Sequence, residues 1–114
     1  MTQHKTYLTE MSARAAYSKA ARSQLVEARA KLDSIRATIK QAAATGRLQP
    51  SEPLNRALGA MEVNFAAAET QLRVLQKSGE PDWEEERHEL DEAWENLARS
   101  IAILVTRFSD ESRD

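Results

Sequence analysis

Large apolar residues recur every three or four positions along most of the chain, with polar residues between them. The pattern is clearest between residues 82 and 108, where only Arg87 interrupts a heptad stripe. This spacing puts the apolar side chains on one face of a helix, which we expect over residues 82–109. The stripe consists of Trp83, Leu90, Trp94, Leu97, Ile101, Leu104 and Phe108.

The first part of the chain predicts one long helix over residues 3–45. This segment contains no Gly or Pro and is rich in Ala, Arg, Lys and Gln, all good helix formers. Gly46 follows it and is expected to take the left-handed conformation that ends a helix. The stripe of this helix is mostly apolar, with Ser18 as a polar member, and consists of Met11, Ser18, Ala21, Leu25, Ala28, Leu32, Ile35, Ile39 and Ala42.

A second helix is predicted over residues 52–78, with Ser51 as its N-cap and Pro53 in its first turn. Gly79 is expected to end it. Asp82 and Glu85 then resemble a capping box at the start of the third helix. The stripe of the second helix runs without a break through Leu54, Leu58, Met61, Phe65, Ala68, Leu72 and Leu75.

Short loops between the helices make consecutive helices antiparallel neighbours. The sequence therefore predicts an all-α fold, an antiparallel three-helix bundle of coiled-coil type. Residues 1–110 form one domain, and residues 111–114 are expected to be a frayed tail. The register that best matches large with small side chains pairs Arg36 with Glu62 and Arg29 with Glu69. It also places Trp94 opposite Ala68, so we expect Trp94 in the core.

The first helix is longer than its two neighbours, at ~60 Å against ~40 Å each for a rise of 1.5 Å per residue. The excess lies at the N-terminus and is expected to overhang the bundle. Tyr7, Leu8, Met11 and Tyr17 lie in this part with no expected partner in the monomer. These four residues are our candidate interaction site, either for a second copy in a homodimer or for an unknown protein.

The composition excludes several classes of protein. Charged residues make up 30% and there is no Cys, which excludes disulfides, thiolate chemistry and Cys-based metal sites. The N-terminus has no apolar signal-peptide region, and no apolar run approaches the ~20 residues of a membrane span. We therefore expect a cytoplasmic protein and disfavour a membrane partner.

The charge is distributed unevenly along the chain. Residues 1–46 carry eight Lys or Arg and three Asp or Glu, a net of +5, whereas residues 80–114 carry four and twelve, a net of −8. The basic first helix and the acidic third helix are expected to neutralise each other. A basic strip for nucleic acid is the alternative, which we rank lower because no recognisable nucleic-acid module accompanies it.

Two sets of polar residues have the composition of binding sites. Arg22, Arg29 and Arg36 recur every seven residues, as in a phosphate-binding stripe, but salt bridges between the first two helices explain them better. The other set lies near the start of the third helix and contains Glu85-x-x-His88, the spacing found in di-iron carboxylate bundles. Those bundles need two such motifs, whereas this set has one, and it is expected to face solvent. We predict no metal site, cofactor, small-molecule substrate or catalytic residue. The second set is Glu84, Glu85, His88, Asp91 and Glu92.

The third helix contains a distinctive set of residues: Trp83-Glu84-Glu85, Ala93-Trp94, Leu97 and Arg107-Phe108. In these residues it resembles the C-terminal helix of small uncharacterised bacterial coiled-coil proteins, some of them labelled stress-response proteins. The resemblance covers about a quarter of the chain and implies a bacterial, non-enzymatic helical protein.

These patterns predict a role in protein–protein interaction or self-assembly. One alternative is an amphipathic protein that coats lipid or polymer surfaces, as phasins and apolipoproteins do, which would require the bundle to open. A nucleic-acid-associated protein that uses the basic first helix is the other.

Overall fold

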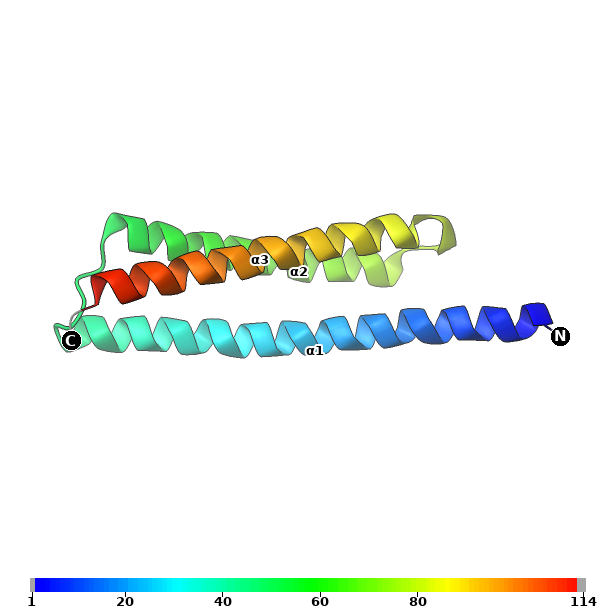
Figure 1. Ribbon diagram of the computed structural model, residues 1–114, viewed down its shortest axis with the longest axis horizontal. Helices are drawn as coiled ribbons and strands as arrows, with labels where there is room; N and C mark the ends of the chain where they lie inside the picture. Colours follow the sequence, from blue (N-terminus) through cyan, green and yellow to red (C-terminus); the bar gives the residue numbers. More distant parts are fainter. Residues whose placement is uncertain (1, 113–114) are drawn as a thin grey trace.

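The computed structural model describes the backbone of residues 2–112 and the side chains of residues 13–79 and 81–112. It contains three α-helices, α1 (Thr2–Ala44), α2 (Glu52–Lys77) and α3 (Trp83–Glu111), with a 3₁₀ turn, η1 (Glu80–Asp82), before α3. Consecutive helices run antiparallel (Figure 1). The predicted all-α three-helix bundle is therefore confirmed.

The turn after α1 has the predicted glycine conformation and contains one buried leucine, Leu48. Gly46 has a φ of +78°, in the left-handed region that favours glycine. The backbone N–H groups of Arg47 and Leu48 both donate to the carbonyl of Ala42, at 2.9 and 3.1 Å. The side chain of Leu48 is only 2% exposed. This loop therefore fixes the C-terminal end of α1 to the bundle.

The start of α2 follows the prediction, but its end does not. The Ser51 hydroxyl accepts a hydrogen bond from the Leu54 backbone N–H at 3.2 Å, as an N-cap does. At the other end Ser78, in an extended conformation, closes the helix, and its N–H donates to the Leu75 carbonyl. The prediction that Gly79 ends α2 is wrong, because Ser78 already ends the helix without a left-handed residue.

The predicted capping box at the start of α3 is also wrong. Asp82 has near-helical dihedral angles, φ −102° and ψ −9°, and its side chain makes no capping hydrogen bond. The turn η1 leads directly into α3 instead, and three glutamates in the first turn face the positive end of the helix dipole. The helix runs through Glu111, which we had placed in the tail, and residues 113–114 lie outside the described part.

The core consists largely of the predicted apolar stripes. Ser100 is a buried position outside those stripes, and its hydroxyl donates to the Leu97 carbonyl at 2.8 Å. Trp94 is half-buried and packs against both groups of core residues, so it is neither fully exposed nor fully buried. The least exposed large side chains are Leu32, Leu54, Met61, Leu75, Leu90 and Leu104.

The three helices do not pack equally closely. The α2 and α3 backbones pack most extensively, α1 packs against α2, and the backbones of α1 and α3 approach each other least. The bundle is 67 Å long and 18 Å wide between Cα atoms. Figure 1 shows α1 continuing past the α2–α3 turn at its N-terminal end, as the difference in helix length predicts.

Candidate interaction surfaces

Tyr17 joins α1 to the start of α3. Its hydroxyl donates a 2.7 Å hydrogen bond to Asp91 Oδ1, and its ring meets Trp83 edge-on, with centroids 5.6 Å apart and ring planes at 76°. The guanidinium of Arg14 lies 5.3 Å from the centre of the Trp83 ring, in cation–π geometry. The prediction that Tyr17 has no partner in the monomer is therefore wrong.

Arg87 extends this contact along α3. Its guanidinium bridges Glu84, at 3.0 Å, and Asp91, at 3.1 Å, so the polar interruption of the heptad stripe is part of an ion-pair network. The hydrogen bond to Glu84 raises the pKa of Arg87. We refer to this group of contacts between α1 and α3 as the Tyr17 clasp. It consists of Arg14, Tyr17, Trp83, Glu84, Arg87 and Asp91.

Burial makes the Tyr17 hydroxyl a poor acid. Partial burial of the phenol, followed by its hydrogen bond to Asp91, raises the pKa of Tyr17 well above its usual value. Both effects favour the neutral phenol, since a phenolate would lose solvation and repel the carboxylate. Tyr17 therefore serves as a hydrogen-bond donor that holds α1 on α3.

The other three candidate residues of the N-terminal part, Tyr7, Leu8 and Met11, lie outside the described side chains. They belong to α1, which is helical from Thr2. Their role as interaction residues stays a prediction.

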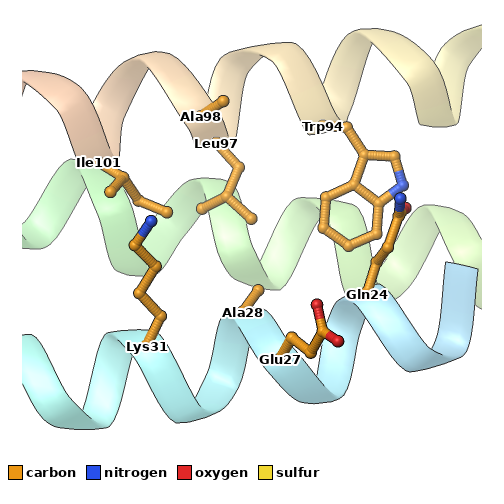
Figure 2. A pocket seen from close by; sticks show the side chains of 8 residues that line it. All are labelled: Gln24, Glu27, Ala28, Lys31, Trp94, Leu97, Ala98 and Ile101. Atoms are coloured by element: carbon orange, nitrogen blue, oxygen red, sulfur yellow. The ribbon is translucent and has the colours of Figure 1, made fainter.

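An open groove separates α1 from α3 beyond the clasp (Figure 2). It contains a cavity of about 340 Å³ and adjoins a second of about 370 Å³ beside Tyr17. Trp94 Nε1 is buried there without a hydrogen-bond partner in the described part of the chain. The α3 wall is apolar and the α1 wall largely polar: Trp94, Leu97, Ala98 and Ile101 face Gln24, Glu27 and Lys31.

The acidic cluster of α3 is divided among separate side-chain pairs. His88 pairs with Glu92 at 3.3 Å, with both side chains exposed. Glu84 and Asp91 are both paired with Arg87. Among the residues with described side chains, no group of three or more His, Asp or Glu is placed to hold a metal ion.

Two of the three regularly spaced arginines of α1 contact partners on α2. Arg36 Nε donates to Glu62 at 2.6 Å, which confirms that predicted pair. Arg29 instead lies over the Phe65 ring at 4.8 Å, and Glu69 pairs with Arg73 at 3.3 Å, so the predicted Arg29–Glu69 pair is wrong. These contacts support the structural interpretation of this stripe over the phosphate-binding one.

The outward face of α2 carries a second regular pattern, which the spacing of large apolar residues does not reveal. Six exposed residues repeat there with spacings of 4, 3, 4, 3 and 4, the same period as the buried stripe of that helix. In the sequence this face is a second heptad pattern, but its residues are mostly small, so they give only a weak apolar periodicity. This face, hereafter the outer seam, consists of Arg56, Ala60, Val63, Ala67, Thr70 and Val74.

No family model, curated protein or solved structure matches this chain. The resemblance of the third helix to bacterial coiled-coil proteins therefore stays a prediction. Among the described residues, no helix has the length and apolar character needed to cross a membrane.

Proposed function

We propose that this protein is a non-enzymatic helical interaction module of coiled-coil type that assembles with itself, and that its assembled state is a homodimer. We also place it in the cytoplasm, an assignment supported by the absence of cysteine from its sequence.

The observation that carries the proposal is the exposure of aliphatic side chains on helices whose core faces are already filled. Val26 is 71% exposed, Val63 68%, Ile103 52%, Val105 46% and Val74 41%. Single exposed apolar residues are common, but those aligned on one helix face favour docking of another helix. A helix face is therefore the surface we expect to meet the partner.

Two surfaces are candidates for this contact. One is the N-terminal part of α1, now reduced to Tyr7, Leu8 and Met11, because Tyr17 already contacts Trp83 and Asp91. The length of α1 supports it, since α1 has 43 residues, against 26 in α2 and 29 in α3. The other is the outer seam of α2.

Light scattering coupled to gel filtration tests the proposal over a range of protein concentrations. A homodimer has twice the chain mass of 12.8 kDa. We expect the full chain to approach this mass as concentration rises. A mass of one chain at every concentration would contradict self-assembly.

One structural observation favours a second candidate function, the coating of an apolar surface. The groove between α1 and α3 leaves the apolar wall formed by Trp94, Ala98 and Ile101 incompletely covered, so release of α1 would uncover a continuous apolar face. Co-sedimentation with anionic lipid vesicles at low salt tests it. Binding together with a change in tryptophan fluorescence supports this function, because release of α1 alters the surroundings of both Trp83 and Trp94. Protein that stays in the supernatant rules it out.

A further inference from the structure

We infer that two copies of this chain pair antiparallel through the outer seam of α2. The inference rests on the proposed self-assembly and names the surface that carries it. The outer seam is exposed along its whole length, and Val63, near its middle, is 68% exposed. Beside it, nothing lies within 4 Å of the place where a Cβ on Gly59 would be. A second helix therefore has room to approach closely.

The outer seam differs in charge from the outward faces of the other helices. Between Arg56 and Val74 its four residues are Ala, Val, Ala and Thr, without a charge. On α1, by contrast, the exposed heptad positions beside Val26 are Lys19, Asp33 and Lys40. The exposed face of α3 carries His88, Glu92, Glu95 and Arg99. Charged side chains favour water, so the α2 face is the least costly of the three to bury.

The outer seam is complementary to itself in an antiparallel pair. When the two copies are related by a two-fold axis near Phe65, each Val63 lies opposite Ala67 of the second copy. Each Ala60 lies opposite Thr70, and each Arg56 opposite Val74. A larger side chain thus meets a smaller one at the centre, and every contact occurs twice, as a two-fold interface requires.

Charges at the two ends of α2 select the antiparallel arrangement. Glu52 lies in the first turn and Lys77 in the last turn of this helix. Antiparallel pairing brings Glu52 of each copy beside Lys77 of the other, whereas parallel pairing would bring like charges together. The helix dipoles also oppose each other in the antiparallel pair. In the single chain Glu52 pairs with Arg56 at 3.0 Å, and both side chains are exposed, which leaves Glu52 accessible to Lys77 of a second copy.

The contact does not involve α1. Arg29 over Phe65 and the Arg36–Glu62 pair mark the side of α2 that α1 covers, away from the outer seam. The dimer therefore needs neither α1 nor its candidates Tyr7, Leu8 and Met11, which leaves that segment free for a different protein.

Sedimentation equilibrium of the full chain and three variants tests this inference. Val63→Glu should raise the dimer dissociation constant at least about a hundredfold, because it buries two unpaired carboxylates per dimer. Val26→Glu is the matched control, since Val26 is equally exposed, at 71%, but lies on α1. It should leave the dissociation constant unchanged, as should the combined Tyr7→Gln, Leu8→Gln and Met11→Gln variant. Circular dichroism checks that each variant keeps its helices.

The possible results separate the inference from the proposed function. A wild-type chain that stays monomeric overturns both. A wild-type dimer that Val63→Glu leaves intact overturns the inference alone, and loss of the dimer in the Tyr7, Leu8 and Met11 variant would assign the contact to α1 instead. Equal weakening by Val63→Glu and Val26→Glu would also overturn the inference, because it would show a nonspecific effect of charge.

Reversal of the end charges tests the orientation. Lys77→Glu should weaken the dimer by roughly two- to tenfold, because it places Glu52 beside a second carboxylate. Adding Glu52→Lys to that variant should restore the dissociation constant to near the wild-type value. If the double variant is no tighter than Lys77→Glu alone, the antiparallel arrangement is wrong.

Discussion

The two halves of α1 are attached to the bundle in different ways. From Leu32 onward α1 is held by apolar burial, with Leu32 1%, Ile39 8% and Ala42 9% exposed. In the preceding described part, residues 13–31, Ala21 is the one buried side chain. There α1 is attached by the Tyr17 clasp and by Ala21, which belongs to a small apolar cluster with Leu72, Leu75 and Leu90. The groove beside Trp94 separates α1 from α3 further along.

This difference shows how one continuous helix can have two kinds of stability. Apolar burial depends little on pH or salt, so the C-terminal half should stay attached in all conditions that keep the bundle folded. The N-terminal half depends more on the hydrogen bond from Tyr17 to the Asp91 carboxylate and on the cation–π contact of Arg14 with Trp83, and these two polar contacts respond to pH and salt. The N-terminal half of α1 should therefore detach first.

Leu32→Ala should produce the largest loss of stability in α1. Removing this buried side chain leaves a cavity against the core, which costs about 2–5 kcal/mol in the free energy of unfolding. Urea denaturation followed by circular dichroism measures it. Val26→Ala, at a site 71% exposed, is the control and should change stability by less than about 0.5 kcal/mol. Similar losses for the two variants would contradict the burial assigned to Leu32.

Tyr17→Phe should weaken the clasp without removing its aromatic contact. The change deletes the hydrogen bond to Asp91, which is only partly buried, and should cost about 1–2 kcal/mol, between the values for neutral and for charged partners. Urea denaturation followed by circular dichroism measures this loss. An unchanged free energy of unfolding would show that the hydrogen bond does not stabilise the attachment of α1.

Alkaline pH should produce the same weakening in the wild-type chain. The pKa of Tyr17 is raised on folding, so its contribution to stability is complete below the unfolded value of about 10 and declines as pH rises above it. The stability difference between the wild type and Tyr17→Phe should therefore shrink above pH ~10. Urea midpoints of the wild type and of Tyr17→Phe, measured from pH ~8 to pH ~11, test this. A difference that stays constant with pH would exclude Tyr17 as the titrating group.

Arg36→Gln should have a smaller effect in the C-terminal half. Its ion pair with Glu62 is partly exposed, with 41% and 40% of the two side chains accessible. Pairs of this kind contribute about 0.2–1 kcal/mol, and salt screens them. The loss should therefore decrease when urea denaturation is repeated at high salt. A loss larger than that of Leu32→Ala would overturn the view that apolar burial holds this half.

His88→Gln should have the smallest effect of all. His88 and its partner Glu92 are both exposed, so the free energy of unfolding should change by less than about 0.5 kcal/mol at neutral pH. The same urea titration used for the other variants measures it. A clear loss of stability would reveal a role for the acidic cluster that its ion pairs do not indicate.

The apolar periodicity predicted most of the fold because burial of large side chains decides where helices begin to pack. Leu54, Phe65 and Leu97 all lie in the core as their spacing indicated. The helix ends after Lys77 and before Trp83 were harder to predict, since a 3₁₀ turn and an extended Ser78 replaced the expected glycine and aspartate caps.

The sequence was less informative about the surfaces. Tyr17 was assigned to an overhang, because heptad spacing does not show that an aromatic ring will meet Trp83 across two helices. The register predicted Arg36–Glu62 but not the position of Arg29, whose guanidinium has an aromatic alternative in Phe65. Contacts that depend on side-chain choice among several partners cannot be read from periodicity alone.

Native-state hydrogen exchange along α1 tests the central claim most directly. Amides in residues 20–31 should exchange at least about tenfold faster than those in residues 35–43, because a local opening that breaks the clasp and the small apolar cluster around Ala21 exposes the first group and leaves the packing of Leu32 and Ile39 intact. Equal protection throughout α1 would contradict this account, since it would show that the helix leaves the bundle only as a whole.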